Sequence, residues 1–183
     1  MSELGNKAAE VASAESKRPD TDEVTDNRSP RIDEYLKLVD LAPKSPTVTG
    51  NEWCGAFVYW CYNEAAKALN QRNPLPLPHT RGGRALRDWA NAHKSWIVYT
   101  IDNKAQEEPT LEPGDVFVVA SLSHIGMVFK PIPNGDSAAH RAFTSIEGNQ
   151  MDSAHPNWGN KGILVKRVEV GRCAVIIRPP AAE

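Results

Sequence analysis

The stretch NEWCGAFVYWCY, residues 51–62, places a cysteine at the start of a segment with the apolar spacing of a helix. This spacing predicts a helix that runs from about Cys54 to about Leu69 and turns one face toward a core. The apolar face carries Phe57, Trp60, Cys61, Ala65 and Ala68. We therefore expect packing of this face to anchor the helix, with Cys54 held in its first turn.

The position of Cys54 favours a reactive thiol. Thr49 and Glu52 have the spacing of a capping box, and Asn51 is a second candidate for the N-cap. Either cap leaves Cys54 near the positive end of the helix dipole, where the pKa of a thiol can be lowered. Because a thiolate attacks carbonyl carbon, Cys54 is a candidate nucleophile.

The composition is that of one globular domain. The chain has 183 residues, of which 40% are hydrophobic and 24% charged. The formal net charge of -2 gives no electrostatic reason to expect nucleic acid or an anionic membrane as a partner. No apolar run approaches the roughly 18 to 20 residues of a membrane span, and the N-terminus lacks the pattern of a secretory signal peptide. We expect a monomer made in the cytoplasm without a signal peptide and without membrane insertion.

The three cysteines are expected to be free thiols. Cys54 and Cys61 would lie about 10 Å apart along one helix at roughly 1.5 Å per residue, which is too far for a disulfide. Cys61 and Cys173 lie in apolar segments, so we expect both to be core residues.

Residues 1–29 form a polar segment. After Met1, its large aliphatic residues are Leu4, Val11 and Val24. Such a segment buries too little apolar surface to offset the entropy lost on ordering, so we expect a flexible tail with at most a transient helix over residues 8–16. The tail is either an address for a partner or delivery machine, or a solvated segment without a role. A single domain would then span residues 30–183.

Beyond residue 30, helical patterns come first and strand patterns afterwards. We expect helices over 30–39, 54–69 and 83–92, with a proline-rich extended connection at 73–78. Runs rich in Val, Ile and aromatic residues predict strands at 96–101, 116–120, 125–129, 142–146, 163–168 and 173–177. This order predicts an α+β domain, with N-terminal helices packed on an antiparallel sheet or small half-barrel of about six strands.

A cysteine nucleophile needs a base, and His124 is the best candidate among the five histidines. It directly precedes the apolar run IGMVF, residues 125–129, so it can project from a sheet edge toward a helix end. The remaining histidines lie in a proline-rich connection, at a helix end or in polar loops, and we expect them on the surface: His79, His93, His140 and His155.

The base in turn needs a group that holds its ring. If strands 125–129 and 142–146 are antiparallel neighbours, Glu147 or Asn149 could lie beside the imidazole of His124. The alternative is that residues 147–149 form only a turn, because Gly and Asn favour turns.

Four segments together resemble the CHAP family, the cysteine/histidine-dependent amidohydrolase/peptidases, which belong with the NlpC-like cell-wall hydrolases in the papain-like superfamily. WCGAFVYWC, residues 53–61, resembles the nucleophile helix of that family, and LEPGDVF, residues 111–117, resembles its PGD turn. SHIGMV, residues 123–128, is similar to the histidine strand, and TSIEGN, residues 144–149, to the segment that supplies the remaining polar residues. The four segments occur in the order of the family.

The resemblance implies a papain-like fold and a role for each matching residue. Cys54 would be the nucleophile, and His124 the general base and then the acid. Glu147 would orient the histidine, with Asn149 as a nearby polar assistant. No metal or organic cofactor is implied.

Substrate contacts are less well defined by the sequence. The oxyanion would be held by the backbone N–H of Cys54 and a second donor, for which Asn51 is a candidate. Trp53 and Trp158 are candidate substrate-binding residues. Trp158 lies in the polar loop 151–160. It would either line a substrate-binding cleft or pack this loop against the rest of the domain.

The substrate class of the family is bacterial peptidoglycan. The implied reaction is hydrolysis of the N-acetylmuramoyl-L-alanine amide, or of a bond in the stem peptide or cross-bridge. The protein would reach the periplasm of a target cell as a toxin resembling type VI secretion amidase effectors, with an immunity protein or a secretion-apparatus component as partner, or act as a phage lysin. Two other interpretations are an amidase on a small peptide conjugate, as in glutathionylspermidine-cleaving relatives, and a non-catalytic CHAP-like binding module.

Overall fold

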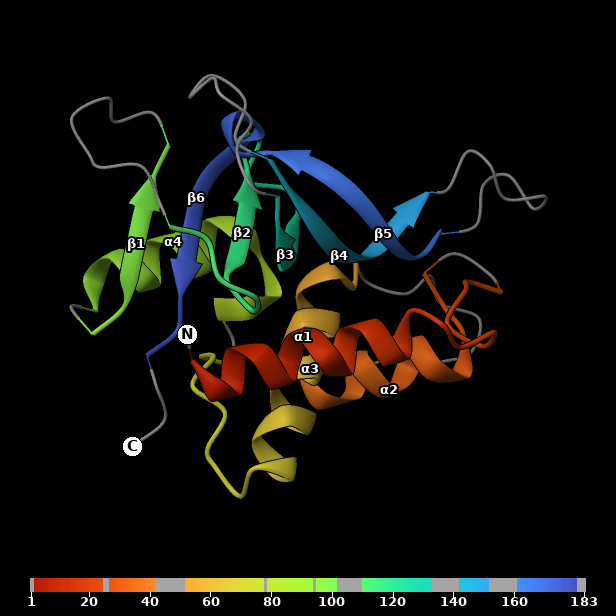
Figure 1. The fold of residues 1–183 in the computed structure, drawn as a ribbon. Helices are drawn as coiled ribbons and strands as arrows, with labels where there is room; N and C mark the ends of the chain where they lie inside the picture. Colours follow the sequence, from red (N-terminus) through yellow and green to blue (C-terminus); the bar gives the residue numbers. More distant parts are fainter. Residues whose placement is uncertain are drawn as a thin grey trace.

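The computed structural model describes residues 2–24, 27–41, 52–77, 79–93, 95–101, 110–132, 142–151 and 161–180. Over these ranges the chain forms helices first and then a sheet of six strands, which confirms the expected α+β class (Figure 1). The helices are α1 (Glu3–Glu15), α2 (Pro30–Leu38), α3 (Cys54–Ala68) and α4 (Gly83–Ala92), with short 3-10 turns η1 (His79–Arg81) and η2 (Val170–Arg172). The strands are β1 (Ile97–Thr100), β2 (Val116–Val119), β3 (Ile125–Pro131), β4 (Ala142–Met151), β5 (Lys161–Glu169) and β6 (Cys173–Arg178).

The sheet is antiparallel and open. Its strand order is β1-β6-β2-β3-β4-β5, so the last strand of the chain lies between the first two. The predicted antiparallel pairing of the 125–129 and 142–146 segments is confirmed, because β3 pairs with β4 with Met127 opposite Ile146. This pairing brings the residue before β3 close to the middle of β4.

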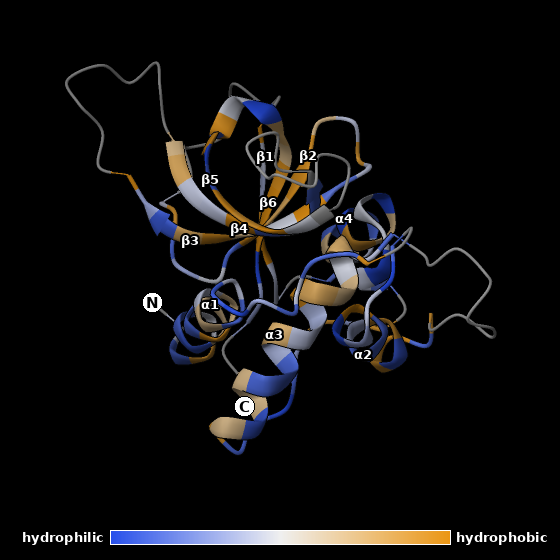
Figure 2. Cartoon of the chain, turned by 90° about the vertical axis from the view of Figure 1, so that its right-hand side faces the viewer, coloured by the Kyte–Doolittle hydropathy of each residue, from blue (hydrophilic) through white to orange (hydrophobic). Residues whose placement is uncertain are grey.

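The helices cover one face of the sheet, with α3 at the centre of the helical layer. Figure 2 shows α3 running below the sheet with α1 and α2 on either side of it. The predicted apolar face of α3 is buried at Phe57, Cys61 and Ala65, while Trp60 is only partly buried. The prediction is wrong for Ala68, which is exposed. Burying a side chain such as Phe57 contributes about 1.5–3 kcal/mol, so this face anchors the helix firmly.

A second apolar cluster lies on the opposite face of the sheet, because strand residues alternate between the two faces. The sheet curls around this cluster, as its arched ribbons show (Figure 2). Its buried members are Phe117, Val128, Phe143, Val168, Val170, Cys173 and Ile176. Each face of the sheet therefore has its own core.

The expectation of a flexible N-terminal tail is wrong for residues 3–15. They form α1, which packs on α3 through buried Leu4, Ala8, Ala9 and Ala12. The far end of α1 is tied to α2, since the buried Glu15 carboxylate accepts hydrogen bonds from Arg31 and from the Tyr35 hydroxyl. Small alanine side chains let the two helices approach closely. The prediction counted only large aliphatic residues and therefore missed this packing.

Candidate active site

Cys54 is the first residue of α3, as the sequence predicts. Neither predicted residue is the N-cap, because the N-cap is Trp53, which makes no side-chain cap hydrogen bond. The two candidates, Thr49 and Asn51, lie outside the described residues. The first N–H groups of a helix have no partner within it, so Cys54 lies where backbone donors and the positive end of the dipole favour negative charge.

Two glycines allow close contacts that fix the start of α3. Gly55 lies against the backbone carbonyl of Thr80 in η1, where a β-carbon would overlap the oxygen. Gly148 of β4 lies against the aromatic rings at the start of α3, where a β-carbon would be 2.6 Å from the Trp53 ring and 2.9 Å from the Phe57 β-carbon. The position of Cys54 is therefore set by direct packing against both a turn and a strand.

His124 directly precedes β3, and its Nε2 lies 2.8 Å from Oε2 of Glu147 on β4. Of the two residues expected near the ring, the structure therefore brings Glu147 to it. Gly126 makes this possible, because a β-carbon there would lie 2.7 Å from Cγ of Glu147. Since a carboxylate only accepts hydrogen bonds, Nε2 is the protonated nitrogen and Nδ1 is left for exchange with a second group.

Cys54 also acts on the His124 ring. Burial lowers the pKa of His124, but hydrogen bonds with Cys54 and Glu147, together with the charges of both, more than compensate and raise it to about 9. The imidazole is therefore favoured in its protonated form when it lies between a thiolate and a carboxylate. His124 thus interacts with both Cys54 and Glu147, and we call these three residues the candidate triad.

The carboxylate of the triad is buried and held by several donors. Glu147 is 1% exposed, Ser145 donates to its Oε1, and Nζ of Lys166 on β5 lies 3.1 Å from its Oε2. Burial raises the pKa of Glu147, but the hydrogen bonds from His124 and Ser145 and the charge of Lys166 keep it below its usual range. Glu147 therefore stays ionised, as a group that stabilises an imidazolium must.

The sequence interpretation missed Gln150 and Lys166. The Gln150 side-chain nitrogen lies 3.0 Å from Nε2 and 3.3 Å from Nδ1 of His124, and its Oε1 accepts a hydrogen bond from Lys166 at 2.7 Å. Lys166 thus contacts both Glu147 and Gln150. The signal that could have found Gln150 is its place next to the matched segment, whereas Lys166 is on another strand and depends on the sheet register.

The structure does not bring Asn149 to the imidazole. Its side-chain nitrogen instead donates to Glu52, just before α3. Asn149 lies in a bulge of β4 between Glu147 and Gln150 and has a positive φ of 61°. Its Oδ1 is buried and has no hydrogen-bond partner in the part of the chain that the structure describes. Asn149 therefore ties the bulge to the segment that leads into Cys54.

The remaining predicted residues have different outcomes. The Trp53 side chain is fully buried, and its indole N–H donates to Glu23 at 3.1 Å, so the expectation that Trp53 binds substrate is wrong for this side chain. Asn51 and Trp158 lie outside the described residues. Cys61 and Cys173 are buried free thiols, as expected, and burial raises the pKa of both, that of Cys173 to about 12.

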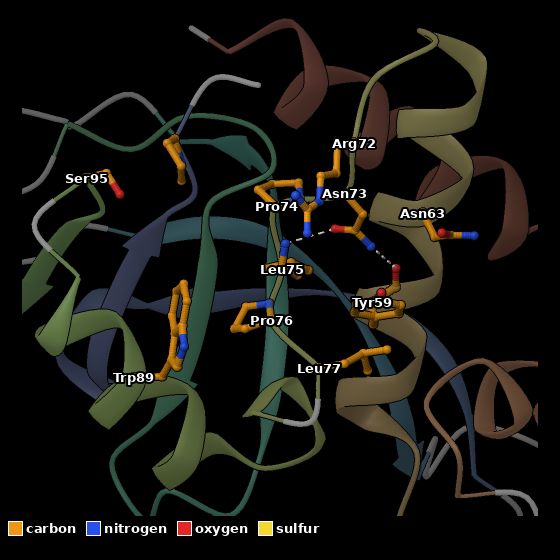
Figure 3. A pocket seen from close by; sticks show the side chains of 11 residues that line it. Tyr59, Asn63, Arg72, Asn73, Pro74, Leu75, Pro76, Leu77, Trp89 and Ser95 are labelled. Carbon is orange, nitrogen blue, oxygen red and sulfur yellow. Dashed lines mark hydrogen bonds between the residues drawn. The ribbon is translucent and has the colours of Figure 1, made fainter. Parts of the chain in front are cut away.

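A hollow of about 930 Å³ lies beside the proline-rich connection (Figure 3). Figure 3 shows Tyr59 and Trp89 on opposite sides of it, with Leu75 and Pro76 between them. Asn73 fixes the connection, since it donates to the Tyr59 carbonyl at 3.3 Å and accepts from the Leu75 N–H at 3.0 Å. Among the described residues that line this hollow, none belongs to the candidate triad.

Within the described ranges, no three His, Cys, Asp or Glu side chains come together in a way that could hold a metal ion. No helix in the same ranges combines the length and apolar character needed to cross a membrane. Comparison of the chain with protein-family models, curated proteins and solved structures gives no match.

Proposed function

We propose that the protein is a cysteine hydrolase that cleaves an amide bond in bacterial peptidoglycan through an acyl-enzyme on Cys54. One observation carries the proposal: Nε2 of His124 lies 2.8 Å from the buried carboxylate of Glu147, and Cys54, at the start of α3, also acts on this imidazole. A thiol, an imidazole and an orienting carboxylate in this order are the groups that nucleophilic acyl transfer requires.

In the acylation step, Nδ1 of His124 takes the thiol proton and the Cys54 sulfur attacks the amide carbon. The carbonyl electrons move to oxygen, and the backbone N–H of Cys54 at the start of α3 is positioned to donate to that oxyanion. When the tetrahedral intermediate collapses, the C–N bond breaks and His124 gives its proton to the leaving amine. Glu147 stabilises the imidazolium throughout.

In the deacylation step, the same groups activate a water molecule that hydrolyses the acyl-enzyme. Neutral His124 takes a proton from a water molecule as the oxygen attacks the thioester carbon. The C–S bond then breaks, the proton returns to the Cys54 sulfur, and a carboxylic acid leaves. No external oxidant, reductant or metal enters this balance.

The choice of peptidoglycan rests on the resemblance of four segments to the CHAP family, and the structure supports it in one respect. The nucleophile lies on a helix that precedes the sheet, and the base and carboxylate lie at adjacent strands, an arrangement consistent with a papain-like fold. As such a hydrolase, the protein would act on the wall of a target cell, as an antibacterial effector or a phage lysin.

The direct test uses purified peptidoglycan sacculi. Wild-type protein should release soluble fragments with new amino termini that identify the cleaved bond, and Cys54→Ala should release none. Cys61→Ala is the matched control, because Cys61 lies on the same helix, is fully buried and is outside the candidate triad. It should retain activity even if it lowers the thermal midpoint.

Thiol labelling separates the alternatives. An alkylating reagent should modify Cys54 and spare Cys61 and Cys173, whose buried thiols have raised pKa values. Selective labelling without release from sacculi would favour a different amide substrate, such as a small peptide conjugate. Absence of both labelling and release would favour a binding module and contradict the proposed hydrolase.

A further inference from the structure

A cavity of about 360 Å³ lies next to the candidate triad, on the face of the sheet that does not carry α3. Glu147 forms part of its wall. Its apolar lining includes Phe117 and Val168 of the second core cluster, and its polar lining includes Ser121, just beyond β2. Glu147 therefore contacts His124 through its carboxylate and also borders this cavity.

The walls of this cavity carry an excess of positive charge. Lys166, Arg167 and Arg172 all line it, and Arg167 and Arg172 also line an adjoining hollow of about 370 Å³ together with Glu169. Three cationic side chains thus face two carboxylates. One of the two, Glu147, is already paired with His124.

The cations are not equally engaged. Lys166 is held by Gln150 and Glu147, and Arg167 forms a long ion pair of 3.6 Å with Glu169. Across the described residues, no hydrogen bond or ion pair engages the guanidinium of Arg172. A planar guanidinium without a partner, beside other cations, is suited to a carboxylate, which it can bind through two parallel hydrogen bonds.

The apolar part of the lining indicates what kind of carboxylate would fit. Phe117 and Val168 would contact aliphatic carbon, and Ser121 offers a hydroxyl at the rim. A small inorganic anion would leave this apolar surface unused, whereas a carboxylate on a short aliphatic chain would cover it. Because Glu147 belongs both to the cavity wall and to the candidate triad, such a group would lie beside the triad.

We infer that this cavity is a subsite for a free carboxylate of the peptide substrate, with Arg172 as its main anchor and Arg167 and Lys166 as supporting charges. The inference rests on the proposed function and deepens it: the preferred substrates are acidic peptides that carry a carboxylate near the amide bond presented to Cys54. The protein would discriminate against neutral analogues because they leave the charge of Arg172 unpaired.

The test compares two soluble stem-peptide fragments, one with free carboxylates and one with the same groups converted to carboxamides. Wild-type protein should cleave the acidic peptide with a kcat/KM at least about tenfold higher, which corresponds to about 1.4 kcal/mol. Arg172→Gln should raise the KM for the acidic peptide about tenfold with little change in kcat, and should hardly affect the carboxamide peptide. Arg84→Gln, an exposed position on α4, is the matched control and should behave as wild type.

A binding measurement separates the subsite from the hydrolase. Protein with Cys54→Ala should bind the acidic peptide more tightly than the carboxamide in a calorimetric titration, and the added Arg172→Gln change should remove the difference. If neither peptide is cleaved but this difference is found, the subsite stands and the proposed function fails. Equal binding of both peptides, or an equal effect of Arg172→Gln on both, would overturn the subsite even if cleavage is observed.

Discussion

The two ends of the candidate triad are held in place by different kinds of interaction. At the nucleophile, the start of α3 is fixed by packing: Gly55 against the Thr80 backbone, and Gly148 against the Trp53 ring. At the base, the imidazole of His124 is fixed by hydrogen bonds and charges that come from β4 and β5. One end depends on shape and the other on polar chemistry.

This difference indicates how the triad can be altered. Packing contacts support both the fold and the position of Cys54, so a change there should reduce stability and activity together. The polar contacts at His124 act mainly on protonation and ring orientation, so a change there should reduce activity more than stability, and its effect on stability should depend on pH. Each prediction below tests one side of this contrast.

The largest effect is expected for Glu147→Gln. The substitution keeps the volume and a hydrogen-bonding group but removes the charge that stabilises the imidazolium, so kcat should fall on the order of 10²- to 10⁴-fold. Steady-state kinetics on released fragments measures the loss, and thermal unfolding should show a midpoint close to that of wild type. Full activity in this variant would mean that another group holds His124.

The next largest effect is expected for Gly148→Ala. The added β-carbon would lie 2.6 Å from the Trp53 ring, so β4 and the start of α3 must move apart. We expect a loss of about 1–3 kcal/mol in unfolding free energy and, because the nucleophile shifts relative to the base, a rate loss of about 10²-fold. Gly171→Ala is the control, since no atom lies within 4 Å of a β-carbon there. A destabilised but fully active Gly148→Ala protein would contradict the packing account.

A smaller effect is expected for Lys166→Met. Lys166 touches Glu147 and Gln150 but not the reacting atoms, so kcat should fall only several-fold, in the range of a single exposed ion pair. Removing this cation from beside Glu147 should also raise the pKa of His124, which a shift in the pH–rate profile would show. Lys130→Met, at an exposed position of β3, should change neither quantity.

The smallest effect concerns the pH dependence of stability. The pKa of His124 is about 9 in the folded protein and roughly 6.5 in an unfolded chain. Its contribution is therefore fully present below about pH 6.5 and is lost as the pH rises through about 9. Denaturant unfolding of wild type and His124→Gln should differ most near pH 6 and progressively less toward about pH 10. A histidine that titrates by NMR near 6.5 in the folded protein would contradict this result.

Sequence patterns predicted the regular elements well, because helix and strand periodicities are local. The helix at Cys54, α4 and all six strands lie within a few residues of their expected positions. The pairing of His124 with Glu147 was also accessible, since it requires only that two neighbouring strands pair. Local periodicity says nothing, however, about partners on a third strand, and Lys166 was missed for that reason.

Other errors have physical causes of their own. The packing of α1 was missed because alanines bury little area each yet allow a close helix contact. Asn149 was expected at the imidazole, but the bulge in β4 adds one residue to the strand and turns its side chain to Glu52 instead. Trp53 was expected at the substrate, but its buried Nε1 is satisfied by Glu23, a residue of the supposed tail.

The close contact between Gly5 of α1 and Gly114, at the turn that leads into β2, has a consequence for folding. α1 is synthesised first, yet this partner follows roughly a hundred residues later, so the contact closes a long loop and raises the contact order of the chain. α1 can dock on α3 before the sheet is made, but its contact with Gly114 must wait for the turn that leads into β2. Docking of α1 is therefore completed late, after its alanine-rich face has been buried against α3.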